Sequence, residues 1–112
     1  MSRVVSEPEF QARLADKLAG LRVCAATGPG RSGAVASVYA SHYLGCPFVP
    51  FGRPGPEGLL LIVDTARESG QTLRKAAKKY AGRDIVVIAI YEEPPRVKFW
   101  YENLRGRNEY TK

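Results

Sequence analysis

The chain lacks a long apolar run and contains few cysteines and histidines. No segment approaches the roughly 20 apolar residues that cross a bilayer, and the N-terminal MSRVVSEPEF has no signal-peptide core. We therefore expect a cytoplasmic protein that does not enter membranes. Cys24, Cys46 and the single His42 share no metal-binding spacing, so no structural metal site is predicted. Both cysteines are better explained as small buried hydrophobic residues.

The remaining composition is that of one globular domain. With 112 residues, of which 45% are hydrophobic and 25% charged, the chain can bury a core without disulfides. We expect a single domain over residues 1–112, with its core at about 7–92. The formal net charge of +6 indicates an anionic partner. Basic residues gather in the tail, 94–112, and at Arg74, Lys75, Lys78 and Lys79. Such a face is usually just solvated, and nucleic-acid binding is the less favoured alternative.

Periodicity predicts a first helix over residues 7–19. Phe10, Leu14 and Leu18 recur every four residues and form one apolar stripe. Ser6 is placed to cap this helix, and Gly20 is placed to end it.

Strands and helices alternate along the rest of the chain. Short apolar segments at 21–27, 46–52, 59–65 and 84–91 predict strands, and the pattern predicts helices at 34–45 and 71–80. The segment LLLIVDT (59–65) is continuously apolar, which is typical of a strand buried on both faces. We therefore predict a three-layer α/β fold, with a mostly parallel central sheet of four or five strands flanked by helices.

Two glycine loops follow predicted strands and open predicted helices. They are GPGRSG (28–33) and the polar cluster Ser69, Gly70, Gln71 and Thr72. Ligands of open α/β sheets bind at this edge, where free amides at a helix N-terminus receive phosphate. An ordinary helix cap at Ser69 is the alternative. Beside a phosphate, Asp64 would face sugar hydroxyls and Glu68 a reacting centre, since carboxylates there need such partners.

The segment LIVDTARESGQT (61–72) resembles the signature of the type I phosphoribosyltransferases. It matches except at Thr65, where the family has a second acid, and at Gln71, where it has a small residue. The upstream segment ATGPGRSGAVASVYASHYLGCPFVPF is similar to the family's first strand, pyrophosphate loop, helix and second strand. The resemblance covers residues 21–91.

The resemblance implies a pentosyltransferase of nucleotide salvage. Such an enzyme transfers the 5-phosphoribosyl group from phosphoribosyl pyrophosphate to a nucleobase, here favoured to be purine-like, and releases pyrophosphate. By this resemblance Asp64 and Glu68 are the catalytic residues, and the pyrophosphate is bound by Gly30, Arg31 and Ser32. The 5-phosphate is bound by Ser69, Gly70, Gln71 and Thr72. Mg²⁺ is held mainly through substrate and water, with Asp64 a possible ligand, and a homodimer is expected.

Three departures from the family favour an alternative. Thr65 removes a carboxylate. The flexible loop that closes over the family's active site is reduced to FGRPGPEG, in which Arg53 is the only basic residue. The hood, the part of the family's fold that selects the nucleobase, is reduced to what the chain termini provide. In the tail, the consecutive aromatic residues Phe99, Trp100 and Tyr101 could stack on a nucleobase, and Phe99 and Trp100 are the base-stacking candidates. Alternatively, these aromatic residues cover a sheet edge or a dimer contact. The alternative is a non-catalytic sensor of a phosphoribosyl compound or nucleotide, or an RNA-binding regulator.

Overall fold

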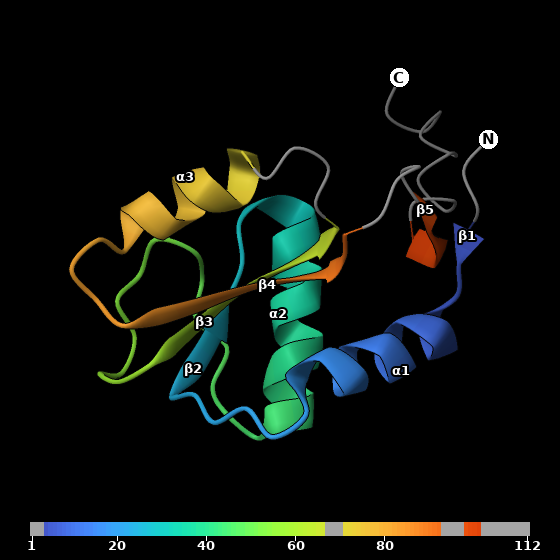
Figure 1. The fold of residues 1–112 in the computed structure, drawn as a ribbon, viewed down its shortest axis with the longest axis horizontal. Coiled ribbons are helices and arrows are strands. Elements are labelled where there is room, and N and C mark those ends of the chain that lie inside the picture. The colour runs from blue at the N-terminus through green and yellow to red at the C-terminus, as the bar shows by residue number, and fades with distance from the viewer. Residues whose placement is uncertain (1–3, 67–70, 93–97, 102–112) are drawn as a thin grey trace.

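The computed structural model describes residues 4–66, 71–92 and 98–101. These residues form strands and helices in the order β1 (Val4–Val5), α1 (Glu7–Leu18), β2 (Ala25–Thr27), α2 (Gly30–Leu44), β3 (Leu60–Ala66), α3 (Gln71–Lys79), β4 (Ile85–Tyr91) and β5 (Lys98–Phe99) (Figure 1). No helix of the described part has both the length and the apolar character needed to span a bilayer.

The central sheet is parallel and has the order β2-β3-β4. The expected four or five strands are not confirmed, because the described residues add only one isolated parallel bridge, between Ala26 and Phe48. Pro47 and Pro50 lie on either side of Phe48 and Val49 and carry no N–H, which limits further pairing in that segment. The predicted α/β class with a parallel sheet is confirmed.

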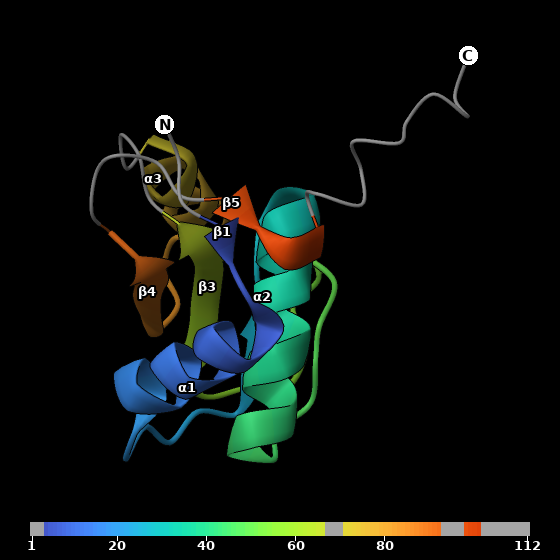
Figure 2. The same cartoon turned by 90° about the vertical axis from the view of Figure 1, so that its right-hand side faces the viewer.

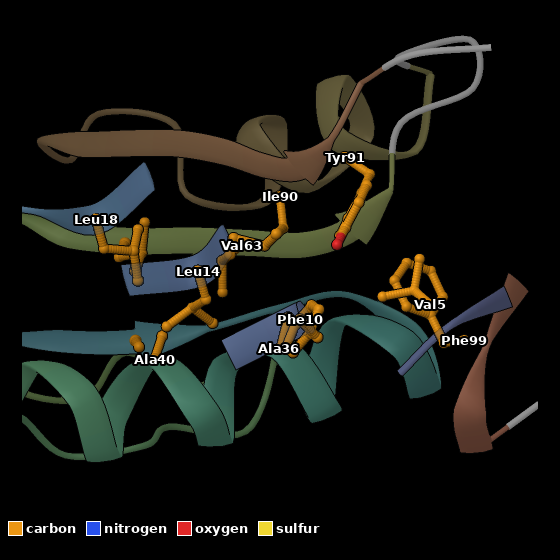
Figure 3. Close-up of a cluster of buried hydrophobic side chains, with 12 residues drawn as sticks. Val5, Phe10, Leu14, Leu18, Ala36, Ala40, Val63, Ile90, Tyr91 and Phe99 are labelled. Carbon is orange, nitrogen blue, oxygen red and sulfur yellow. The ribbon is translucent and has the colours of Figure 1, made fainter. Parts of the chain in front are cut away.

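Both faces of the sheet are covered, which explains the continuous apolar run of β3. Leu61 and Val63 face a core shared with α1 and α2, whereas Leu60 and Ile62 face a core shared with α3. Figure 3 shows the first of these cores. Helices therefore lie on either side of the sheet, in the three layers that the sequence predicts.

Helix α1 confirms the helix predicted from the apolar stripe. Phe10, Leu14 and Leu18 are buried, and the Ser6 side chain accepts a hydrogen bond from the backbone N–H of Glu9 at 3.2 Å. Helix α2 differs from its prediction, because it begins at Gly30, inside the glycine segment. The strand predicted at 21–27 is also shorter and begins at Ala25.

A second, two-stranded sheet joins the two ends of the chain. In it β1 pairs with β5 in parallel, with Val4 opposite Lys98 and Val5 opposite Phe99. Each of these strands has two residues, too few for any sequence period to reveal them. Figure 1 and Figure 2 show β1 and β5 side by side, apart from the central sheet. Of the tail predicted as a hood or dimer contact, the structure describes residues 98–101.

Candidate functional site

A pocket of about 320 Å³ lies where β3 ends and α2 and α3 begin. It is lined by residues of three elements and the C-terminal segment: Pro29, Gly30, Arg31, Ser32, Asp64, Thr72 and Tyr101. Five of these, Gly30, Arg31, Ser32, Asp64 and Thr72, are predicted site residues. The structure thus brings these five predicted residues together, although they are up to 42 positions apart in the sequence (72 − 30).

The first turn of α2 presents uncapped amides to this pocket. Pro29 occupies the N-cap position without a side-chain hydrogen bond, and the first turn contains no acidic residue. The N–H of Gly33 donates to the carbonyl of Pro29 at 3.0 Å, whereas Gly30, Arg31 and Ser32 line the pocket. The first amides of a helix have no intrahelical acceptor and carry the positive end of the helix dipole. This turn is therefore suited to bind an anion.

Two glycines bring the start of α2 against the sheet. A Cβ at Gly28 would lie 2.3 Å from the carbonyl oxygens of Gly33 and Val63, and one at Gly33 would lie 2.6 Å from the carbonyl carbon of Gly28. No side chain fits at either position. Gly30 has a φ of +67°, which favours glycine for a different reason. The glycine segment therefore lets α2 pack closely against the sheet and places the first turn of α2 at the pocket.

Asp64 is the acidic side chain that lines the pocket. It lies near the end of β3 and is 8% exposed. Burial raises the pKa of Asp64 to about 6, although the Thr65 N–H, which donates to Oδ1 at 2.8 Å, opposes the shift. At pH 7 the carboxylate is still mostly ionised and can accept hydrogen bonds from hydroxyl groups. Its charge changes within the mildly acidic range.

Thr65 stands where the resembled signature has a second acid. It is 3% exposed and is not among the residues that line the pocket. Because successive side chains of a strand point to opposite faces, Thr65 and Asp64 are directed to different sides of the sheet. The replacement of an acid by Thr65 therefore leaves the pocket carboxylate in place.

The second predicted phosphate loop is only partly described. Thr72, in the first turn of α3, lines the pocket, and that turn contains no acidic residue. Gln71 is exposed at the first position of the helix. Glu68, Ser69 and Gly70 lie outside the described residues. Two helix N-termini nevertheless border one pocket, so it is suited to a ligand with two anionic groups.

Among the described tail residues, 98–101, Tyr101 is the aromatic residue that lines the pocket. Its hydroxyl donates to Ser32 Oγ at 3.2 Å, and its ring stacks on Phe99 with centroids 5.8 Å apart. Phe99, a base-stacking candidate, is 2% exposed and packs in the core beside Val5 (Figure 3), so the structure does not bring its ring to the pocket. The sequence contains three consecutive aromatics, and nothing in their order reveals which one lines a site.

Trp100, the other base-stacking candidate, is half-buried away from the pocket lining. Its ring lies 5.6 Å from that of Phe10 and 6.1 Å from that of Tyr39, measured between centroids. These contacts join the C-terminal segment to α1 and α2. The sequence-based alternative expects the tail aromatics to cover the sheet edge or a dimer contact, whereas the rings of Phe99 and Trp100 both pack against Phe10 of α1.

Arg53, the flexible-loop candidate, does not line the pocket. Its carbonyl accepts a hydrogen bond from the Tyr80 hydroxyl at 3.0 Å, and this hydroxyl accepts from the N–H of Gly52 at 2.7 Å. The guanidinium of Arg83 donates to the carbonyls of three further loop residues, Pro54, Pro56 and Gly58. Tyr80 and Arg83 follow the end of α3, at the opposite end of that helix from Thr72. The loop is therefore held at the far end of the sheet.

The described residues do not form a metal cage of their own. Among them, no three His, Cys, Asp or Glu side chains gather closely enough to hold a metal ion. Mg²⁺ keeps several waters and commonly uses one or two carboxylates together with substrate phosphates. Asp64 beside an anion-binding turn fits that kind of binding, in which the substrate supplies most of the oxygens.

The fold is that of phosphoribosyltransferases. The structure is similar to a purine phosphoribosyltransferase from Pyrococcus horikoshii, with a TM-score of 0.61 and 18% identity over 88% of this chain and 89% of the other. It is also similar to a hypothetical protein from Neisseria gonorrhoeae that was solved with bound ppGpp, with a TM-score of 0.58 and 15% identity over 88% and 81%. No protein-family model matches the sequence, and no curated protein matches it significantly.

Proposed function

We propose that this protein is a phosphoribosyltransferase of nucleotide salvage, which transfers the 5-phosphoribosyl group from phosphoribosyl pyrophosphate to a nucleobase, favoured to be purine-like. The observation that carries the proposal is the pocket that Asp64 lines together with the first turns of α2 and α3. Phosphoribosyl pyrophosphate has an anionic group at each end and ribose hydroxyls between them. The two helix N-termini and the carboxylate of the pocket offer a partner to each of these groups.

In this proposal the start of α2 binds the pyrophosphate. The amides of Gly30 and Ser32 and the positive helix end attract its charge, and the Arg31 guanidinium can pair with two phosphate oxygens. The 5-phosphate binds at the start of α3, with Thr72 and Gln71 as partners, together with Ser69 and Gly70 of the undescribed segment. No lysine is needed for either anion.

Asp64 accepts hydrogen bonds from the ribose hydroxyls. Its position in the lining and its ionisation at neutral pH suit that role. Mg²⁺, when bound, would neutralise pyrophosphate charge, with Asp64 as the pocket carboxylate available to it or to its waters. Tyr101, rather than Phe99, offers an aromatic surface to the incoming base, because its ring borders the pocket.

The reaction breaks the bond between the anomeric carbon and pyrophosphate and forms a bond from that carbon to a base nitrogen, which loses its proton. Positive charge develops on the ribose and negative charge on the leaving group. The α2 amides and Arg31 stabilise the leaving group. Glu68, which lies outside the described residues, is proposed to stabilise the positively charged ribose, as the sequence resemblance implies.

A pyrophosphate-release assay tests the proposal. The protein is incubated with Mg²⁺, phosphoribosyl pyrophosphate and a panel of bases, and pyrophosphate is measured. We expect release with at least one base. Arg31→Ala should weaken binding of the pyrophosphate end, and Glu68→Gln should lower turnover more than binding. Arg22→Ala, which removes an exposed arginine outside the pocket, is the matched control for Arg31→Ala. Equal effects of the two arginine variants would contradict the assigned role.

A sensor that binds a phosphoribosyl compound or nucleotide without catalysis is the second candidate. One feature favours it: the loop that includes Arg53 is bonded to Tyr80 and Arg83 far from the pocket. The similarity to the protein with bound ppGpp supports including that nucleotide among the ligands tested. If no base gives turnover while phosphoribosyl pyrophosphate or ppGpp raises the melting temperature, the enzyme proposal fails and the sensor candidate survives.

A further inference from the structure

Helix α3 carries a basic face that the proposed reaction does not use. We define the α3 basic face as Arg74, Lys75, Lys78 and Lys79, all of which are exposed. The opposite side of the helix is buried through Leu73 and Ala76. At 100° per residue, the four cations occupy about 140° of the helix surface. Figure 1 shows α3 across the sheet from α1 and α2, so the other helices do not cover this face.

The charges of the α3 basic face are uncompensated within the described residues. The helix contains no acidic residue, and none of the four cations has an ion pair or hydrogen bond there. Arg74 and Lys78 are four residues apart, as are Lys75 and Lys79, and like charges at that spacing repel. Lys78 and Lys79 lie in the last turn, where the negative end of the helix dipole favours cations, but Arg74 and Lys75 lie outside that turn. Without an anion, the repulsion between the paired cations is unfavourable for the helix.

The chemistry of the face selects among possible partners. Specific protein interfaces have an apolar core with aromatic residues and few lysines, and membrane-surface helices insert an exposed apolar face. The exposed positions of the α3 basic face offer neither, since Leu73, the one large apolar side chain of the helix, is buried. Nucleic acids, in contrast, are bound chiefly by lysine and arginine contacts to phosphates. A polyphosphate backbone is the partner that this face fits.

The size of the face favours a single strand over a duplex. Residues 74 to 79 span about 7.5 Å along the helix axis, at a rise of about 1.5 Å per residue. The major groove that separates the backbones of a DNA duplex is about 12 Å wide, so a duplex would place mainly one backbone on the face. A flexible strand can instead bring successive phosphates onto all four cations. We propose that the α3 basic face binds single-stranded nucleic acid through its phosphates, independently of the reaction at the pocket.

Fluorescence anisotropy with a labelled 12-nucleotide single strand tests the proposal in the full-length protein. Four phosphate contacts on a single strand give a slope of log K against log salt of about −2.8, which lowers affinity about 50-fold between 50 and 200 mM salt. Lys75→Gln with Lys79→Gln should reduce the magnitude of the slope by about 1.4. The charge-conserving pair Lys75→Arg with Lys79→Arg should retain the slope and shows whether changes at these positions disturb folding.

The matched control removes two positive charges elsewhere. Lys17→Gln with Arg22→Gln lowers the formal net charge from +6 to +4 (6 − 2), as the Lys75 and Lys79 glutamine pair does, and leaves α3 unchanged. We expect this control to keep the wild-type slope within about 0.5, and RNA and DNA strands of one sequence to bind about equally, because phosphates alone are contacted. The proposal would be overturned if the two glutamine pairs reduced the salt slope equally, or if no binding occurred at 50 mM salt. Tighter binding to a duplex or to anionic vesicles than to the single strand would also overturn it.

Discussion

Replacing Asp64 by asparagine should stabilise the protein at neutral pH while it weakens ligand binding. Asparagine keeps the size of the side chain and an Oδ1 that can accept the N–H of Thr65, but it removes the charge. The charge is unfavourable for folding, because burial raises the pKa of Asp64 from 3.8 to about 6. A buried charge that destabilises a fold and lines a pocket is typical of a functional residue.

The magnitude follows from that pKa difference. At 1.36 kcal/mol for each pKa unit the ionised form costs about 3 kcal/mol, and we expect about 2–3 kcal/mol because the carboxylate borders an open pocket. Below pH 3.8 the carboxyl group is neutral in both states and costs nothing. Between pH 3.8 and about 6 the unfolded chain ionises first, so stability is lost as the pH rises. Above about pH 6 the full cost is present.

Guanidinium denaturation of the wild type and of Asp64→Asn between pH 3.5 and 8 measures the effect. The two proteins should have similar free energies of unfolding near the acidic end, and the variant should be more stable by about 2–3 kcal/mol at pH 7. That difference corresponds to about 10 °C in melting temperature for a chain of this length. Asp16→Asn, at an exposed position of α1, serves as the matched control for the substitution. A stability difference that is the same at both pH values would refute the reasoning.

Three further substitutions test the packing and the pocket wall. Gly33→Ala should destabilise the protein by about 1–3 kcal/mol in denaturant titrations, because its Cβ would meet the Gly28 backbone at 2.6 Å, whereas Val38→Ala at an exposed position of the same helix should cost little. Arg83→Gln should cost about 1–3 kcal/mol and increase proteolysis of the 52–58 loop, without weakening ligand binding at the pocket; a matching loss of binding would contradict the placement of the loop. Tyr101→Phe loses the hydrogen bond to Ser32 but keeps the ring, so this variant should bind the nucleobase more tightly than Tyr101→Ala does. If calorimetry showed tighter binding by Tyr101→Ala, a contact between the ring and the nucleobase would be excluded.

Much of the core fold can be predicted from the sequence, because it depends on local periodicity. The stripe of Phe10, Leu14 and Leu18 predicts α1, and the unbroken apolar run before Asp64 predicts a strand covered on both faces. These patterns reflect burial, which repeats with the period of each element. The small sheet of β1 and β5 has no such signal, since it consists of two pairs of residues from opposite ends of the chain.

The candidate site is predictable in part for a similar reason. Asp64, Arg31 and Thr72 lie at strand ends and helix starts, which a parallel sheet brings to one edge. Which tail aromatic borders the pocket depends on where β5 ends: Phe99 closes the strand with its ring in the core, and Tyr101 lies two residues further. The placement of Arg53 depends on bonds to Tyr80 and Arg83, distant partners that no short motif encodes.

The central claim is that one pocket binds phosphoribosyl pyrophosphate between the starts of α2 and α3. A titration of the ¹⁵N-labelled protein with this compound and Mg²⁺, followed through backbone amide chemical shifts, tests the claim without requiring catalysis. The largest shifts are predicted at Gly30 to Gly33, at Gln71 to Leu73 and at Tyr101. Shifts confined to residues of the α3 basic face, with the first turn of α2 unchanged, would contradict the claim.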